Sequence, residues 1–343
     1  MALDIYSTAT LAGVIETVKP SLPGFWMNFF NRSFAFDTEE VDFDIVMVDR
    51  RIAPFVMPTS TGVPTRDAGY ATRKFKPAYS KILSAINPRR TLERRPGEGF
   101  GGTLSPEQRA MAIIGQYAVD HRSMMERRWD WMAARALLDG SLTITGEHYP
   151  SVTIDFQRAA NQTVTLASGS RWGDAGVKAM STIEAWSTTV FQASGFPVNT
   201  VIMGTSAWTA FAADTEVRAL MALYRGADKV GGLSIVPGSG ETLQYKGNDG
   251  SRDYWVYNDY YDADDGTPVA IMDPRDVLLV NQAGLAGAKC FGAILDMDSL
   301  RAQPIFTKSY VEDNPSARFV LSQSAPLMVP GRPNASFKAR VVA

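Results

Sequence analysis

Residues 105–140, SPEQRAMAIIGQYAVDHRSMMERRWDWMAARALLDG, decide how the rest of the chain is interpreted. Ser105 is a suitable N-cap, Pro106 fits the first helical position, and Gln108 can complete a capping box, so a helix is expected to begin here. Apolar or aromatic side chains then recur at three- and four-residue steps, or multiples of them, as far as Leu138. At ~1.5 Å per residue the helix would be about 50 Å long, nearly three times an ordinary helix. It is therefore expected to brace an extended body.

On the C-terminal side of this helix the sequence changes to a period of two, which is typical of strands. Leu142 and Ile144, followed by Val152 and Ile154, predict a hairpin. From residue 170 onward, helical and strand patterns alternate as in a compact α/β domain. The expected elements there are a helix near 176–194, a strand over 198–203, a helix over 206–224, a hairpin whose strands 243–245 and 254–257 flank Asn248-Asp249-Gly250, and strands over 277–280, 319–324 and 336–342.

The N-terminal side has few features of an independent core. A short helix is expected over 8–18, and a strand over 41–45, where apolar residues alternate with acidic ones. Between Met57 and Gly102, prolines interrupt helices and large apolar residues are too sparse to form a core of their own. This segment is therefore expected to pack against something else.

Two neighbouring segments here carry opposite charges. Residues 37–50 contain six acidic side chains, among them Asp42 and Asp44, and one basic side chain, a net charge of −5. Residues 66–95 contain nine basic and two acidic side chains, a net charge of +7. The basic stretch ends in a cluster of arginines, Arg89, Arg90, Arg94 and Arg95. This cluster could contact phosphate or an acidic protein surface, and the protein surface is favoured because the whole chain carries a formal charge of only −2.

Composition limits the class of protein. With 343 residues, 45% of them hydrophobic, the chain can bury a sizeable core in about two domains. The single cysteine, Cys290, excludes an internal disulfide framework and fits a reducing cytoplasm. Residues 1–20 do not have the pattern of a signal peptide, and no run of about 18 apolar residues could span a membrane. Production in the cytoplasm is expected, without export.

Two motifs match binding sites only formally. Gly97-X-Gly99-X-X-Gly102 has the spacing of a dinucleotide fingerprint, but it follows a basic, proline-containing loop instead of an apolar strand, so a hinge is favoured. The acidic run 259–266 lacks the glutamate of a calcium loop, because Met272 stands at that position. A solvated turn is the favoured interpretation of this run.

The histidines and the cysteine do not form a catalytic pattern. His121 lies inside the long helix, on a face shared with Tyr117 and Met124, and is expected to pack. His148 lies in the predicted hairpin. Cys290 has apolar neighbours and is expected to be a small core residue. The sequence therefore predicts no active site, no metal site and no cofactor.

The order of these elements resembles a known fold. An arm, a basic extended loop, a very long helix, a hairpin, an α/β domain and return strands follow one another as in the α+β Hong Kong 97-type capsid fold. More specifically, the chain resembles the lambda-type major head protein family. The resemblance is carried by four segments spread over nearly the whole length, Phe29 to Phe34, Asn87 to Gly97, Leu137 to Glu147 and Gln323 to Met328.

The resemblance implies a division of the chain into five parts. These are an N-terminal arm (N-arm) over 1–45, an extended E-loop over 46–102, a P-domain with the spine helix over 103–172, an A-domain over 173–299, and return strands of the P-domain over 300–343.

It also implies a structural function without catalysis. The subunit is expected to self-assemble as pentamers and hexamers into the icosahedral head of a tailed bacteriophage, around packaged double-stranded DNA. Assembly would take place in the host bacterial cytoplasm, with a separately encoded scaffolding protein, a portal and a decoration protein as partners. DNA contact would be non-specific, and no membrane is involved. The covalent lysine–asparagine link of the fold's founding example is not expected here.

The arrangement suggests where subunits touch. We expect the +7 loop to lie over the acidic arm or spine region of a neighbouring copy, because complementary charges steer and register contacts. The residues expected at such contacts are Arg89, Arg90, Arg94, Arg95, Phe29, Phe30, Asp42 and Asp44.

Two alternatives stay open at this point. One is an encapsulin-like nanocompartment shell on the same fold, which the contents of purified particles would distinguish. The other is a cytoplasmic enzyme that uses the α/β region, which a ligand-induced thermal shift would favour.

Overall fold

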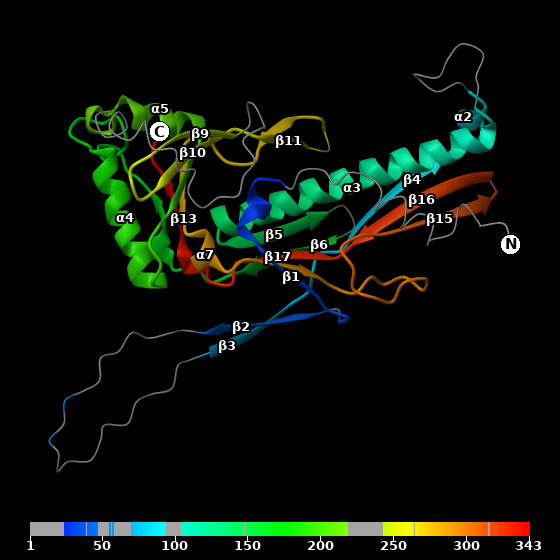
Figure 1. The fold of residues 1–343 in the computed structure, drawn as a ribbon, viewed down its shortest axis with the longest axis horizontal. Helices are drawn as coiled ribbons and strands as arrows, with labels where there is room; N and C mark the ends of the chain where they lie inside the picture. The colour runs from blue at the N-terminus through cyan, green and yellow to red at the C-terminus, as the bar shows by residue number, and fades with distance from the viewer. Residues whose placement is uncertain are drawn as a thin grey trace.

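The computed structural model describes residues 24–38, 40–46, 55, 57, 70–93, 104–146, 149–218, 243–263, 265–314 and 316–343. The long helix α3 (Pro106–Leu138) runs beside a narrow sheet towards one end of an elongated body, while α4 (Ala179–Ser194) and α5 (Thr205–Ala213) lie at the other end (Figure 1). The predicted helix over 8–18, the glycine motif 97–102, His148, Arg94 and Arg95 lie outside the described residues. Within the described part, no helix is both long and apolar enough to cross a membrane.

The predicted start of α3 is confirmed in detail. The Ser105 hydroxyl accepts a hydrogen bond from the Gln108 amide at 3.2 Å, and the Gln108 side chain accepts one from the Ser105 amide at 2.9 Å. These two bonds satisfy amides that the first turn of a helix leaves without partners. The helix has 33 residues, so the long strut expected from the sequence is present.

The end of α3 is held by a residue distant in sequence. The Arg158 guanidinium donates hydrogen bonds to the carbonyls of Leu137 and Leu138, the second at 2.8 Å. Gly140 follows with a positive φ of 67°, and an added Cβ there would lie 2.9 Å from the Arg158 Nε. A partly buried cation thus meets the negative end of the helix dipole.

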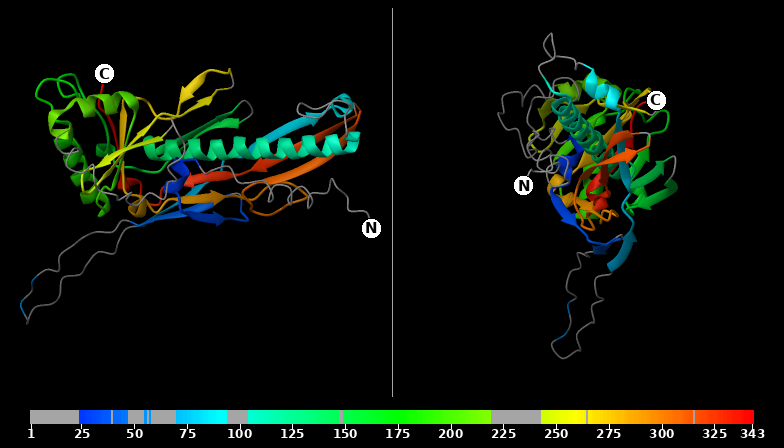
Figure 2. Two further views of the ribbon diagram at one scale, coloured as in Figure 1. Left: turned by 45° about the horizontal axis from the view of Figure 1, so that its top comes forward. Right: turned by 90° about the vertical axis from the view of Figure 1, so that its right-hand side faces the viewer.

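A three-stranded antiparallel sheet runs alongside the first half of α3 (Figure 2). Its order is β15 (Phe306–Asp313), β16 (Ser316–Ser324) and β4 (Ser80–Ile86). Ile113 and Ile114 of the helix pack against Ile86 and Val320 of the sheet. This small core joins the strut to the strands.

The opposite end contains a six-stranded sheet with a core of its own. Its order is β7 (Thr163–Thr165), β18 (Ser336–Arg340), β13 (Asp276–Val280), β8 (Thr200–Met203), β10 (Asp253–Tyr257) and β9 (Leu243–Asn248). Helices α4 and α5 contribute Ile183, Val190 and Phe211 to this core. The predicted hairpin β9–β10 and the predicted strands β8 and β13 are confirmed.

The helix predicted over 206–224 is wrong in extent, because it ends at Ala213. Asp214 is extended, and its carboxylate accepts hydrogen bonds from the amides of Ala179 and Glu216. A short aspartate side chain competes for backbone amides in this way and interrupts helices. Residues 215–218 begin a new helical turn.

Shorter elements connect these two halves. A third sheet has the order β1 (Arg32–Ala35), β14 (Ala288–Phe291) and β17 (Pro326–Val329), with β1 parallel to β14. The remaining elements are the 3₁₀ turns η1 (Trp26–Phe29), η2 (Ala160–Gln162) and η3 (Pro333–Ala335), the helices α2 (Pro88–Leu92) and α7 (Gln282–Leu285), and the strand pairs β2 (Val41–Val46) with β3 (Tyr70–Phe75), β5 (Ser141–Gly146) with β6 (Tyr149–Asp155), and β11 (Tyr260–Asp262) with β12 (Pro268–Ala270).

The return segment 300–343 divides among three sheets. Strands β15 and β16 lie beside the spine helix, β17 joins β14, and β18 joins β13 and β7 in the six-stranded sheet. The end of the chain is therefore shared between both halves of the molecule.

The expectation that Phe29 and Phe30 contact another subunit needs correction. Both side chains are fully buried in the chain's own core, together with Trp26 and Met125. The resemblance places both residues in the N-terminal arm, but η1 packs against α3 of the same chain. These two phenylalanines have no surface to offer a neighbour.

Candidate functional site

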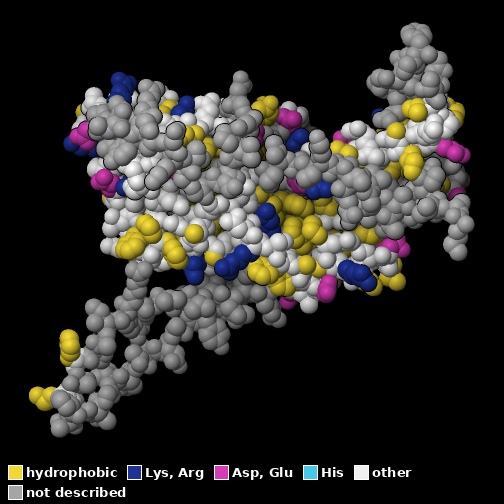
Figure 3. Space-filling view, viewed as in Figure 1, with side chains coloured by type: hydrophobic (Ala, Val, Ile, Leu, Met, Phe, Trp, Pro, Cys, Tyr) yellow, Lys and Arg dark blue, Asp and Glu magenta, His cyan; other side chains and the backbone are white. Residues whose placement is uncertain are grey.

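The hairpin β2–β3 projects away from the body (Figure 1). Its register places Asp42 opposite Lys74 and Asp44 opposite Thr72, so the acidic strand pairs with part of the basic segment of its own chain. Phe55, which lies between the two strands in sequence, is fully exposed. Apolar side chains stand at the far end of this projection in Figure 3. A large apolar side chain held in water far from its own core is typical of a surface that a partner covers.

The described arginines of the basic cluster lie on α2, near the start of α3. Asn87 caps this short helix by accepting a hydrogen bond from the Arg89 amide at 3.0 Å. Arg89 forms an exposed ion pair with Glu93 at 3.2 Å. Arg90 donates to the Tyr117 hydroxyl, and its guanidinium lies 5.6 Å from the centre of that ring. The chain itself thus positions both cations at the surface, where another subunit could reach them.

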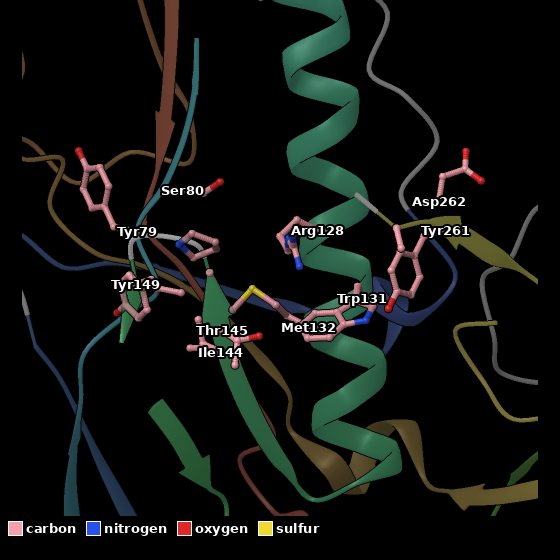
Figure 4. Close-up of a pocket in the computed structure, with 14 residues that line it drawn as sticks. Tyr79, Ser80, Arg128, Trp131, Met132, Ile144, Thr145, Tyr149, Tyr261 and Asp262 are labelled. Atoms are coloured by element: carbon pink, nitrogen blue, oxygen red, sulfur yellow. The ribbon is translucent and has the colours of Figure 1, made fainter. Parts of the chain in front are cut away.

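A hollow of about 380 Å³ lies beside the C-terminal third of α3 (Figure 4). Trp131 and Met132 reach into it from the helix, and Tyr79, Tyr149 and Tyr261 come from three other segments. Arg128 and Arg135 lie over the Trp131 ring at 5.4 and 5.9 Å, so the indole is held between two cations of its own helix. Among the described residues, the buried Trp131 N–H has no hydrogen-bond acceptor.

A second hollow of about 500 Å³ shares Trp131 and Tyr261 with the first one and is lined by acidic residues. Asp130 lies at its base and accepts a hydrogen bond from the Met27 amide at 3.0 Å. Burial raises the pKa of Asp130 to about 7, although backbone amides of Met27 and Trp26 favour the charged form. The same burial lowers the pKa of nearby Lys289. This carboxyl therefore fastens η1 to the long helix.

His121 occupies the structural position predicted for it. Its ring is buried between α3 and the sheet, with Nε2 2.8 Å from the Ser84 hydroxyl and Nδ1 2.9 Å from the Ser322 hydroxyl. Burial lowers the pKa of His121. The histidine is used to connect the helix with β4 and β16.

Cys290 is fully buried in the main core, as expected from its apolar neighbours. Burial raises the pKa of its thiol to about 12, so the sulfur is not a thiolate nucleophile near neutral pH. In the part of the chain that the structure describes, no three His, Cys, Asp or Glu side chains are grouped to hold a metal ion. Where β11 turns into β12, the Ala263 amide donates to the Thr267 carbonyl at 2.9 Å and the Gly266 amide donates to the Ala263 carbonyl at 2.8 Å.

The described chain thus combines an elongated body, a projecting hairpin and exposed cations on α2. The model of the phage major capsid protein E family matches residues 7–341 of this chain. The chain belongs to this family. Its sequence relatives include the major capsid protein of Escherichia phage N15, 28% identical over 97% of this chain and 98% of that protein, and that of Escherichia phage lambda, 27% identical over the same shares.

Solved structures agree with this assignment. A prophage capsid protein from Escherichia coli CFT073 superposes with a TM-score of 0.77 at 22% identity and covers 98% of this chain and 99% of its own. The capsid of Myoviridae phage XM1 superposes with a TM-score of 0.50 at 10% identity over 95% of this chain and 94% of its own. The protein therefore has the Hong Kong 97-type capsid fold, and it is a structural protein of the virion, as its relatives are, and not an enzyme.

Sequence reasoning found the charged loop and the long helix but missed two features of the site. Asp130 stands between two tryptophans, and an acid in such an apolar context was a usable signal of a buried carboxyl. The second feature is the loop 292–304 between β14 and β15, which is held by Asp37, Tyr79 and Gln323. It gave no local signal, because these partners come from distant segments.

Proposed function

We propose that this major capsid protein builds the icosahedral head of a tailed bacteriophage, as pentamers and hexamers around packaged double-stranded DNA. The observation that carries the proposal is the family match over residues 7–341, which includes the projecting loop as well as the compact parts. The exposed Phe55 supports it, because a large apolar side chain in water gains stability when a sister copy covers it.

The proposal includes the partners and the place of assembly. Shells would form in the host bacterial cytoplasm on a separate scaffolding protein, with a portal and a decoration protein, and contact with DNA would be non-specific. The near-neutral charge of the chain supports weak contact with DNA, since dedicated nucleic-acid binders carry a basic excess. The division into N-arm 1–45, E-loop 46–102, P-domain 103–172, A-domain 173–299 and return strands 300–343 belongs to the same proposal.

Within this shell, the arginine cluster is proposed to contact a neighbouring copy. Arg89 and Arg90 are exposed on α2, and we assign Arg94 and Arg95 the same role from their place in the sequence. Their partners would be acids of the neighbour's arm or spine region, with Asp42 and Asp44 as candidates. Opposite charges across such a contact would set its register and speed association.

The test is co-expression of the chain with the scaffold gene of the same phage, followed by electron microscopy. Closed shells are expected from the wild type. Reversal of all four arginines to glutamate should abolish most shells while the soluble subunit keeps its melting temperature, because the described members of the cluster are exposed. The matched control replaces the same four residues with lysine, which keeps the charge.

Two results would count against these proposals separately. A wild-type chain that stays monomeric at high concentration with its scaffold present would contradict the shell. Normal shells from the glutamate variant would contradict only the arginine contact.

A further inference from the structure

The loop between β14 and β15, residues 292–304, presents large apolar side chains to solvent. Met297 is 90% exposed, Leu300 66% and Leu295 52%. Apolar side chains gather along the lower edge of the body in Figure 3, where Figure 1 draws this loop in orange. Several large apolar residues close together in one exposed loop are more than the scattered single exposures of an ordinary surface.

Polar bonds from three strands or their flanks fix this loop in place. The Lys308 ammonium contacts Asp296 at 2.7 Å and Asp298 at 3.2 Å. Gln323 donates to Asp296 at 2.7 Å and accepts from the Tyr79 hydroxyl at 2.6 Å. The Tyr79 hydroxyl in turn accepts from the Leu295 amide at 3.1 Å.

The N-terminal part of the chain adds further bonds. Asp37 accepts a hydrogen bond from the Ala302 amide at 2.8 Å, and the Thr38 carbonyl accepts one from the Ala293 amide at 3.4 Å. Inside the loop, the Ile294 amide donates to the Arg301 carbonyl at 3.2 Å. A loop fixed this firmly loses little conformational entropy when a partner covers it, which is how preorganised contacts gain affinity.

An apolar pocket lies directly beside the loop. It has a volume of about 220 Å³, and Pro77, Ala293, Leu295 and Ala325 form much of its wall. Lys76 lies at the same pocket. Methionine, with its flexible and polarizable side chain, is well suited to fill an irregular apolar space.

The 292–304 loop and the pocket are complementary in charge as well as in shape. Asp298 follows the exposed Met297 and is itself largely exposed, at 58%. Lys76, on the pocket side, carries the opposite charge and is exposed. If Met297 enters the pocket of another molecule, its neighbour Asp298 comes near the Lys76 ammonium.

We propose that the 292–304 loop and the adjacent pocket are the two halves of a contact between copies of this chain. Met297 of one copy enters the pocket formed by Pro77, Ala293 and Ala325 of the next, and Asp298 pairs with Lys76 across the contact. The inference rests on the proposed function, because it names a surface by which the subunits of the shell join. Both halves lie on one chain, so a single kind of subunit can repeat the contact.

The first experiment changes Met297, the side chain proposed to enter the pocket. Met297→Glu places a charge in the apolar pocket, so the yield of closed shells should fall by about tenfold or more, as at an interface hot spot. Met297→Leu is the matched control and should assemble like the wild type. Both monomers should keep the wild-type melting temperature, since Met297 has almost no contact within its own chain. Normal shells from Met297→Glu would overturn the inference and leave the proposed shell standing.

The second experiment tests the occupant by changing the charges at Lys76 and Asp298. Lys76→Glu should reduce shell yield because it places two carboxylates at the contact, and addition of Asp298→Asn should recover part of that yield because the repulsion between copies is removed. Asp298→Asn alone is the control for the loop, since its amide oxygen can still accept from the Lys308 ammonium. Damage that Lys76→Glu causes within one copy would not be repaired by a change at Asp298. Absence of rescue, or retained shells that lose only the scaffold or the decoration protein, would overturn a contact between copies. If the wild type forms no shells at all, the proposed function itself fails.

Discussion

The six-stranded sheet and the projecting hairpin β2–β3 differ in how their apolar side chains are covered. Strands β8, β10 and β13 are buried along their whole length, and α4 and α5 complete their cover. The hairpin leaves the body, and Phe55 in its loop is fully exposed. The six-stranded sheet therefore buries its apolar surface within the single chain, whereas the loop of the hairpin carries an apolar side chain that the single chain leaves exposed. We therefore expect stability of the subunit and information for assembly to be located in different regions.

The largest expected effects come from truncation of one aromatic residue in each region, because stability of the subunit and assembly should then change separately. Phe211→Ala removes a ring that packs against Trp172, Trp208 and Tyr254 in the sheet core, and should lower the free energy of unfolding by about 3–5 kcal/mol. Phe55→Ala should change it by less than ~0.5 kcal/mol, because no folded-state contact is lost. Urea unfolding of the monomer measures both.

Shell yield completes this comparison. Phe55→Ala should assemble poorly in spite of its normal stability, because a side chain that a neighbour covers is lost. If Phe55→Ala unfolds at much lower urea concentration than the wild type, the division of roles between the two regions is incorrect.

Loss of Arg158, which caps the C-terminal end of α3, should have the next largest effect on the free energy of unfolding. It affects the place where α3 joins the half of the molecule that contains the six-stranded sheet. Arg158→Ala leaves the carbonyls of Leu137 and Leu138 without their donor in a mostly buried site, which costs about 2–3 kcal/mol. Arg158→Lys, which keeps the charge and at least one bond, should recover part of this loss. Equal stability of the alanine variant and the wild type in thermal unfolding would contradict the capping role.

An effect that depends on pH is expected at Asp130, which anchors η1. The pKa of Asp130 is raised by burial to about 7 in the folded state, above its ordinary value of 3.8. The stabilisation linked to the protonated form is complete below pH ~4 and is lost as the pH rises towards 7. Asp130→Asn keeps an oxygen that accepts from the Met27 amide but cannot ionise.

Stability of the wild type and of Asp130→Asn should therefore diverge between pH 4 and pH 7. The asparagine variant should gain on the order of 4 kcal/mol relative to the wild type over this range and keep that gain above pH 7. Urea unfolding at a series of pH values provides the measurement, and parallel curves for the two proteins would exclude a raised pKa at Asp130.

Local signals explain which parts of the fold could be predicted. The limits of α3 follow from Ser105, Pro106 and Gln108 at one end and Asp139 and Gly140 at the other, and these signals act within one or two turns. The β9–β10 hairpin follows from Asn248-Asp249-Gly250 in the same way. Each of these features depends on residues that are close in sequence.

Contacts between distant segments explain the rest. The burial of Phe29 and Phe30 depends on a core built from α3, β14 and β17, and the rigidity of the 292–304 loop depends on Tyr79, Lys308 and Gln323. Neither feature produces a periodic pattern of apolar residues in its own segment of sequence. The charged loop was predictable as a candidate contact from composition alone, but the pocket beside Pro77 was not, because several segments meet there.

The parallel pairing of β1 with β14 has a consequence for the timing of synthesis. Arg32 pairs with Ala288, so the partner of β1 leaves the ribosome more than 250 residues later, on the order of ten seconds or more at bacterial rates of translation. Until then β1 cannot pair with β14, and the contacts that hold the 292–304 loop are incomplete. If subunits join as proposed, a nascent chain lacks the finished surface with which to recruit sister molecules, and we expect lattice growth on polysomes to be prevented.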